Sequence, residues 1–328
     1  MADKIRLGLI GASVKGTWSS RSHLPALRAS ADVELTAVCT TKAETAEAAL
    51  EAGKHVYCEW PLGRTTAEAV ELAALAKAKG LVTAVGLQAR VNPAILYMKE
   101  LVAAGFVGEM MAVHVSMIRD GVLTRPSHRT WQRDAELGAN TLTIANGHTV
   151  DAMRFVTGDF GALSAVVATR AKQWLDTGSN TWLDVTAPDN ILISGTLANG
   201  AVVSSHVGHI PFAGSGYRME IYGREGTLVA SGEDSPQLSE VSLHGAKSGK
   251  TLAPIAVPER FTFASQSTPS GEAFNVGQMY ALFAQAIRNR ATPGGGNGLP
   301  SFDTAVELHR LVDATKQASD TGRAMTFA

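Results

Sequence analysis

Three glycines near the start of the chain, Gly8, Gly11 and Gly16, have the spacing of a phosphate-binding turn. Gly8 lies within an apolar run, 5–10, of the kind that forms a short buried strand, and Gly11 and Gly16 follow that run. Glycine allows a tight turn close to a pyrophosphate, and the N-terminus of a following helix offers it free N–H groups. The G-x-G-x-x-G pattern is only partly met, because Ser13 stands at its second glycine, so a plain strand–helix turn is the alternative. The residues expected to face a dinucleotide are Gly11, Ala12, Ser13, Lys15 and Gly16.

The end of the second strand-like run, 33–39, bears on which dinucleotide would bind. It lacks the carboxylate that commonly holds the ribose 2′-hydroxyl of NAD. Thr40, Thr41 and Lys42 follow instead, and two hydroxyls and a cation suit a 2′-phosphate. We therefore expect NADP, with NAD as the alternative. A helix N-cap at Thr41 followed by a solvated lysine is the structural interpretation of the same residues.

Strand and helix patterns alternate around these residues, which predicts βαβ units and an N-terminal Rossmann-like parallel sheet. We assign this dinucleotide-binding domain to residues 1–92. The expected strands are 5–10, 33–39, 55–60 and 81–86, and the expected helices are 22–30, 42–52, 66–79 and 92–104.

The remainder of the chain, 93–328, is expected to be a C-terminal α+β domain for substrate and dimer contacts. Its strand-like runs are separated by Gly- and Asn-rich turns, which predicts an open, mostly antiparallel sheet. The expected strands are 111–117, 162–169, 190–197, 201–207, 217–222 and 227–231, and the expected helices are 149–157, 274–290 and 302–319.

The composition excludes several classes of protein. The 328 residues are 45% hydrophobic and 18% charged, as in a globular chain. A net charge of −1 provides no basic face for nucleic acid. Two cysteines, Cys39 and Cys58, are too few for a disulfide framework or a four-thiolate zinc site, and we expect no metal. No apolar run reaches the roughly 18 residues of a membrane span, and no signal peptide is evident, so we expect a cytoplasmic protein.

Five segments resemble the Gfo/Idh/MocA oxidoreductases, the family of glucose–fructose oxidoreductase and inositol dehydrogenase. Residues 53–62 (GKHVYCEWPL) are similar to its Glu-Lys-Pro segment, and the others are 86–93, 146–151, 222–228 and 318–322. The resemblance covers essentially the whole chain and is closest to the Gal80-like subgroup, which also has Trp after the Glu. It implies a Rossmann domain that binds NAD(P) and a second domain that holds a sugar- or polyol-like substrate.

The resemblance also implies a site. His148 would be the catalytic residue. On the cofactor side it adds Glu59, Trp60 and Gln88, and for the substrate pocket it implies Trp60, Arg90, Trp131, Asn140, Ile144 and His148.

Two of these positions depart from the family pattern. Family dehydrogenases use the Lys of Glu-Lys-Pro to polarise the reacting oxygen, and here Trp60 cannot carry charge. They also use an Asp four residues before the His, and here that residue is Ile144. His148 remains to accept the hydroxyl proton, and an unperturbed imidazole pKa of about 6.5 suits that step. A hydrogen-bonded structural histidine is the alternative.

A strand–helix unit of the family is missing between Lys42 and Glu51. We interpret the missing strand as the edge strand of the order 3-2-1-4-5-6, which leaves the order 2-1-4-5-6. A single helix should then join Thr41 to Gly53. The fold can survive this loss, but the lost loop would normally help to enclose the cofactor.

Three interpretations stay open. The first is an NADP-linked oxidoreductase acting on a sugar- or polyol-like alcohol or aldehyde. The second is a non-catalytic NADP-binding sensor of the Gal80 type that acts through a protein partner, which Trp60 and Ile144 favour. The third is a truncated, structurally sound protein that binds no cofactor. Because a bare open sheet would expose a large apolar patch, we also expect a homodimer or larger assembly.

Overall fold

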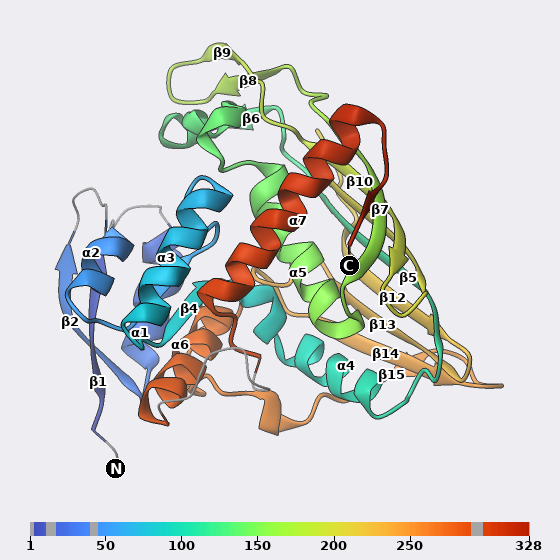
Figure 1. The fold of residues 1–328 in the computed structure, drawn as a ribbon, viewed down its shortest axis with the longest axis horizontal. Coiled ribbons are helices and arrows are strands. Elements are labelled where there is room, and N and C mark those ends of the chain that lie inside the picture. Colours follow the sequence, from blue (N-terminus) through green and yellow to red (C-terminus); the bar gives the residue numbers. More distant parts are fainter. Residues whose placement is uncertain (1–2, 11–17, 40–44, 290–297, 328) are drawn as a thin grey trace. The chain divides into compact units, whose positions relative to one another are not determined.

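The structure is a computed structural model that describes residues 3–10, 18–39, 45–289 and 298–327. The described chain divides into two compact units (Figure 1). A first break between the units falls after Asn92, and residues 258–307 belong with the N-terminal part. Unit 1 consists of Met1–Asn92, Gln237–Glu240 and Pro258–Glu307, and unit 2 of Pro93–Pro236, Val241–Val257 and Leu308–Ala328.

Unit 1 contains two parallel sheets of two strands each. β1 (Ile5–Ile10) pairs with β2 (Val33–Cys39), and β3 (Val56–Glu59) pairs with β4 (Thr83–Gly86). The predicted parallel pairing within each sheet is confirmed. The predicted strand order is wrong, because among the described strands β1 and β3 are not neighbours in one sheet. Both strands instead line a cavity of about 850 Å³ along their whole length.

The helices of unit 1 begin and end close to the predicted positions. The single helix predicted between the second and third strands is α2. Thr65 caps α3, its side chain accepting a hydrogen bond from the Glu68 N–H. The helices are α1 (Leu24–Ala29), α2 (Thr45–Glu51), α3 (Thr66–Ala78) and α6 (Glu272–Arg288), and the shorter helical turns are η1 (Ser19–His23), η2 (Gln88–Val91) and η6 (Glu259–Phe261).

Helix α6 connects the two small sheets. Its apolar residues recur at helical spacing, so two stripes of the helix are buried. Met279 and Phe283 belong to a buried cluster with Val82 and Ala84 beside β4. Tyr280 belongs to a second cluster with residues of α1 and β2. Packing against both sheets explains why this distant segment joins the N-terminal unit.

Unit 2 is built on a nine-stranded sheet. Its spatial order is β15-β14-β13-β12-β5-β11-β10-β7-β16, and every pair is antiparallel except β5 with β11. This confirms the predicted open, mostly antiparallel sheet. The strands are β5 (Met110–Arg119), β7 (Phe160–Ala168), β10 (Asn190–Leu197), β11 (Val202–His209), β12 (Gly216–Gly223), β13 (Gly226–Gly232), β14 (Ser242–Lys247), β15 (Ala253–Pro254) and β16 (Met325–Thr326).

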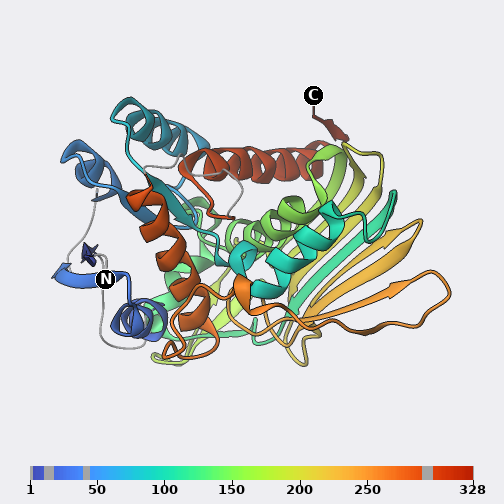
Figure 2. The same cartoon turned by 90° about the horizontal axis from the view of Figure 1, so that it is seen from below.

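The two faces of this sheet differ. Helices α4 (Pro93–Ala103) and α5 (Asn146–Thr157) lie side by side against one face (Figure 2). Side chains alternate between faces along a strand, so Ile191 and Ile193 of β10 are buried while Leu192 between them is 44% exposed. Val166, the neighbour of Leu192 on β7, is also exposed. The outer face therefore carries exposed apolar side chains.

A smaller three-stranded sheet of unit 2 is formed by β6 (Thr124–Arg125), β8 (Gln173–Asp176) and β9 (Thr181–Asp184). Helical turns η3 (Ser127–Arg133), η4 (Ala135–Leu137) and η5 (Thr141–Ala145) follow β6 and lead into α5. Helix α7 (Phe302–Thr321) contains the boundary between the two units. Among the residues that the structure describes, no helix has both the length and the apolar character that a membrane span requires.

Candidate functional site

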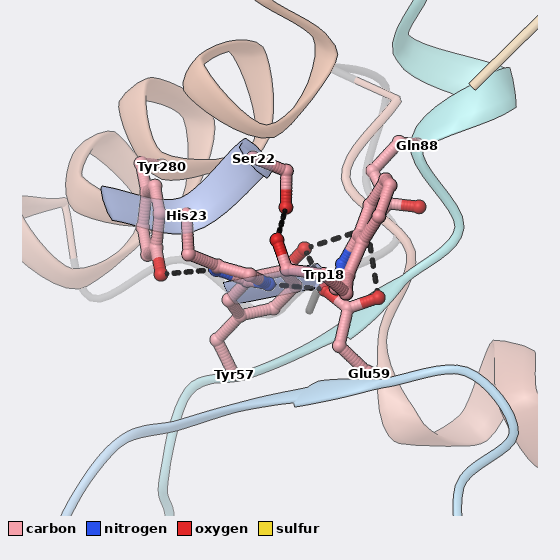
Figure 3. A network of polar contacts seen from close by, with 7 residues as sticks. All are labelled: Trp18, Ser22, His23, Tyr57, Glu59, Gln88 and Tyr280. Atoms are coloured by element: carbon pink, nitrogen blue, oxygen red, sulfur yellow. Dashed lines mark hydrogen bonds and ion pairs between the residues drawn. The ribbon is translucent and has the colours of Figure 1, made fainter. Parts of the chain in front are cut away.

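A polar network in unit 1 surrounds the Glu59 carboxylate at the end of β3 (Figure 3). The Nε2 atom of His23 lies 3.0 Å from Oε1 of Glu59, and its Nδ1 atom lies 2.7 Å from the hydroxyl of Tyr280. The hydroxyl of Tyr57 donates to the same carboxylate at 2.8 Å, and the Gln88 amide donates to both of its oxygens at 2.9 and 3.0 Å. The network joins η1, β3, η2 and α6.

These contacts determine protonation states. Burial alone would raise the pKa of Glu59, but the hydrogen bonds and charge of His23, with further donors from Gln88 and Tyr57, lower it overall. Glu59 therefore stays ionised at neutral pH. Burial, and then the negative charge of Glu59, raise the pKa values of Tyr57 and Tyr280 well above the ordinary value of a tyrosine. The same two causes raise the pKa of the Cys58 thiol to about 12. The tyrosines thus act as donors, and the Cys58 thiol is not activated as a nucleophile.

Gly86 in β4 makes room for this carboxylate. A Cβ atom at Gly86 would lie 2.5 Å from Oε2 of Glu59 and 2.8 Å from Oε1. The absence of a side chain here allows the carboxylate to pack against the neighbouring strand.

The described residues of unit 1 fit a dinucleotide in two respects. The 850 Å³ cavity reaches the carboxyl ends of parallel strands β1 and β3, where α/β sheets bind ligands, and it has the size of a cofactor site. In addition, the indole N–H of Trp18 and Oε1 of Gln88 are buried without a partner among the described residues. Trp18 lines the cavity, so an acceptor on a bound ligand, such as the carboxamide oxygen of nicotinamide, would satisfy its N–H.

A second candidate site lies in unit 2. It is a cavity of about 80 Å³ where the small sheet, η3 and η5 meet the ends of β5 and β11. Three arginines line it, Arg119, Arg125 and Arg129, together with His209 and Trp174. No carboxylate is among the described residues that line it.

Asp176 at the end of β8 fixes η3 beside this cavity. Its carboxylate accepts hydrogen bonds from the Ser127 hydroxyl at 2.6 Å, the Gly178 N–H at 2.9 Å and the Ser179 hydroxyl at 2.9 Å. The bond from Ser127 contributes most to a lowered pKa of Asp176, so the carboxylate is ionised at neutral pH. Ser127 begins η3, the turn that carries Arg129.

Both units are similar to known proteins. Residues 17–87 match the Gfo/Idh/MocA family model, described as an oxidoreductase family with an NAD-binding Rossmann fold. Residues 93–232 match the C-terminal domain of Gal80p. The two models together span most of the chain, which is therefore similar to the Gfo/Idh/MocA oxidoreductases and to Gal80-type proteins. The match in unit 2 covers all the residues that line its cavity, and the match in unit 1 includes Glu59 but ends before Gln88.

Proteins similar to this chain include enzymes and regulators. The dehydrogenase aclE of Aspergillus oryzae is 28% identical over 305 residues, 90% of this chain and 79% of that protein. A super-repressor mutant of Gal80p from Saccharomyces cerevisiae has a TM-score of 0.84 at 20% identity, with 99% of each chain covered. Levoglucosan dehydrogenase in complex with NADH and L-sorbose has a TM-score of 0.78 at 19% identity, with both chains fully covered. The two solved structures show a shared fold.

The predicted cofactor residues divide into two groups. Glu59 and Gln88 lie together in the polar network, and Trp60 is buried directly after it. The other predicted cofactor residues, in the glycine turn and after the second strand, lie outside the described residues: Gly11, Ala12, Ser13, Lys15, Gly16, Thr40, Thr41 and Lys42.

The predicted substrate residues are only partly brought together. Asn140 and Ile144 both line the cavity of unit 2. Asn140 also caps η5, because its side chain accepts hydrogen bonds from the N–H groups of Leu142 and Thr143. His148 is buried in the first turn of α5 and is not among the lining residues.

Two further predicted residues lie elsewhere. Trp131 in η3 is 49% exposed and does not line the cavity. Arg90 is half-buried in η2 of unit 1.

Sequence reasoning missed most of the groups that these sites contain. His23 and Tyr280 are 257 residues apart, and Arg125 and His209 are 84 apart. No local pattern connects such pairs. The detectable signal was the spacing of Arg119, Arg125 and Arg129 after a strand, which suggests a basic loop at a sheet edge.

Proposed function

We propose that this protein binds NADP, with NAD as the alternative, in unit 1, and a sugar- or polyol-like alcohol or aldehyde in unit 2. On this proposal it is an oxidoreductase with low turnover. The observation that carries the proposal is the unit 1 cavity at the carboxyl ends of β1 and β3, beside an ionised Glu59, in a chain similar to an NAD-binding family.

The residues that would hold the cofactor are those of the glycine turn together with the network. The nicotinamide ring, when bound, accepts or donates the hydride. Trp18, which lines the cavity, has an unused N–H donor for its carboxamide oxygen. Glu59 keeps Gln88 in place through two hydrogen bonds from the amide nitrogen. The Gln88 oxygen is thereby directed away from the carboxylate.

His148 would take the proton of the substrate hydroxyl. Two groups that would assist it are missing. Trp60 supplies neither a proton nor a full positive charge, and Ile144 supplies no carboxylate to orient the imidazole or stabilise its charged form. Because groups of this kind each commonly contribute a factor of 100 or more, we expect turnover at least about 100-fold below the median of about 10 s⁻¹.

A sensor function is the second candidate. It is favoured by the same replacements and by the match of residues 93–232 to the C-terminal domain of Gal80p. Such a protein would bind the cofactor and a protein partner without turnover. The two candidates share the cofactor site and differ in whether His148 acts on a substrate.

Calorimetric titration of NADP⁺ and NAD⁺ tests the cofactor. We expect tighter binding of NADP⁺ and a loss of that preference in Lys42→Asp, with Lys250→Asp as an exposed control. Tighter binding of NAD⁺ would contradict the proposed specificity. NADP⁺ reduction with a panel of sugars and polyols tests the activity. Slow reduction that is lost in a folded His148→Ala variant supports the enzyme, and cofactor binding with no reduction supports the sensor.

A further inference from the structure

The unit 2 cavity has a strong excess of positive charge for its size. About 80 Å³ is room for roughly five water-sized groups, which is the size of a phosphate or of a carboxylate with its neighbouring carbon. Three guanidinium groups surround this space, and Ile144 and Ala145 form an apolar wall. A neutral polyol would leave the Arg125 guanidinium without a carboxylate partner among the described residues.

Arg125 is the best-fixed of the three arginines. One terminal nitrogen donates to the carbonyls of Gly121 and Thr124, both at 2.8 Å, and the other donates to Nδ1 of His209 at 3.0 Å. The guanidinium carbon lies 4.5 Å from the centre of the Trp174 ring. Two of its five N–H groups are unused, and no carboxylate pairs with it among the described residues.

His209 leaves the positive charge to the arginines. Its Nε2 atom lies 2.6 Å from the carbonyl of Asp120, so this nitrogen carries the hydrogen and Nδ1 accepts from Arg125. Burial, and then the charge of Arg125, lower the pKa of His209 to about 4. The imidazole is therefore neutral at pH 7 and positions the guanidinium by accepting its hydrogen bond.

The arginines repel one another across the cavity. Burial, and then the charges of Arg129 and Arg119, lower the pKa of Arg125 to about 10, so it remains charged at neutral pH but destabilised. Arg119 is paired with Asp234 through two contacts of 2.9 and 3.0 Å. Arg129 donates to the Gln132 amide oxygen at 3.2 Å. A bound anion would relieve the repulsion on Arg125.

Other groups near the cavity do not supply that anion. The Asp189 carboxylate accepts from the N–H groups of Arg170 and Ala171 and from the Asn190 amide, and it does not line the cavity. The indole N–H of Trp174 is buried without a partner among the described residues. The cavity thus offers unused N–H groups of Arg125 and Trp174, and no carboxylate is among the described residues that line it.

We propose that this cavity binds the anionic group, a carboxylate or a phosphate, of a sugar-derived ligand. Arg125 and Arg129 would contact the anion, and His209 is the positioning residue for Arg125. The inference rests on the proposed function, because it names the class of substrate for the same protein. It predicts sugar acids or sugar phosphates in place of neutral sugars and polyols.

Calorimetry at pH 7 without cofactor tests this inference with four probes: gluconate, glucose 6-phosphate, sorbitol and inorganic phosphate. We expect at least one of the two sugar anions to bind at least tenfold more tightly than sorbitol, and the preferred anion identifies carboxylate or phosphate. Arg129→Gln, on an exposed turn, should weaken this binding at least tenfold. Arg125→Gln should do the same if it folds, and Arg224→Gln, an exposed arginine outside the cavity, should have no effect.

Equal affinity for sorbitol, no binding of either sugar anion, or full affinity in Arg129→Gln would overturn the inference. Binding of inorganic phosphate without binding of either sugar anion would also overturn it, because the cavity would then hold an adventitious ion only. Failure of NADP⁺ and NAD⁺ to bind would remove the proposed oxidoreductase function and leave the anion result intact, so the two failures are distinguishable.

Discussion

Acid should weaken unit 2 through His209 in a specific pH range. In the folded protein burial lowers the pKa of this imidazole, and the neighbouring charges of Arg125 and Arg119 lower it further, to about 4 from an ordinary value of 6.5. Asp189 and the Asp120 carbonyl oppose this effect only in part. Between these two pH values the unfolded chain carries a proton on His209 that the folded chain lacks.

The sign and size follow from this difference. Stability rises with pH wherever the unfolded state binds more protons, so the contribution is complete above pH 6.5 and is lost as the pH falls toward 4. A shift from 6.5 to about 4 corresponds to about 3 kcal/mol at 1.36 kcal/mol per pKa unit. Carboxylates such as Glu59 and Asp176, whose pKa values are lowered, add their own loss at more acidic pH.

Urea unfolding of the unaltered chain and of His209→Gln, at intervals from pH 7.5 to 4.5, isolates the histidine. Glutamine keeps a donor and an acceptor but does not titrate. Over this pH range the free energy of unfolding of the variant should therefore fall by about 2–3 kcal/mol less than that of the unaltered chain. His128→Gln, which removes an exposed histidine from η3, is the matched control. Identical pH profiles for the unaltered chain and His209→Gln would refute the reasoning.

Two further predictions concern packing. Gly86→Ala should lower the free energy of unfolding by about 1–3 kcal/mol, because its Cβ would displace the Glu59 carboxylate from its donors. Gly8→Ala, whose Cβ would meet nothing closer than 3.9 Å, should change it little, and equal urea midpoints for the two variants would contradict this explanation. The chain should be a homodimer or larger in solution through the outer sheet face, and Leu192→Asp should convert it to monomer by light scattering; a monomeric unaltered chain would exclude this interface.

The elements of unit 2 could be predicted well because each long strand has its own alternation. The strand expected over 190–197 is found as β10, and its buried and exposed residues alternate as the pattern indicated. The cavity could not be predicted in this way. It depends on the pairing of β6 with β8, which involves two residues of each strand about 50 positions apart. Strands this short have no periodicity to detect.

In unit 1 the sequence indicated which residues form strands but not which strands meet. A buried parallel strand is apolar on both faces, so its composition does not identify its neighbours. The order 2-1-4-5-6 assumed that the chain closes over the missing unit, whereas β1 and β3 remain unpaired with each other and share a cavity. Helix α6 could not be assigned to this unit either, because its position depends on contacts with strands more than 180 residues earlier in the chain.

Side chains take over part of the role of the absent backbone pairing. A ladder between β1 and β3 would fix the loop after β1 against the end of β3. Without it, the described link between the helix that follows that loop and β3 is His23, which contacts Glu59 of β3 through one ring nitrogen and Tyr280 of α6 through the other. This arrangement needs an ionised Glu59 carboxylate, which receives the contact from His23 and the hydrogen bonds from Tyr57 and Gln88. Any change that protonates or displaces Glu59 should therefore loosen the cofactor end of the cavity as well as destabilise the unit.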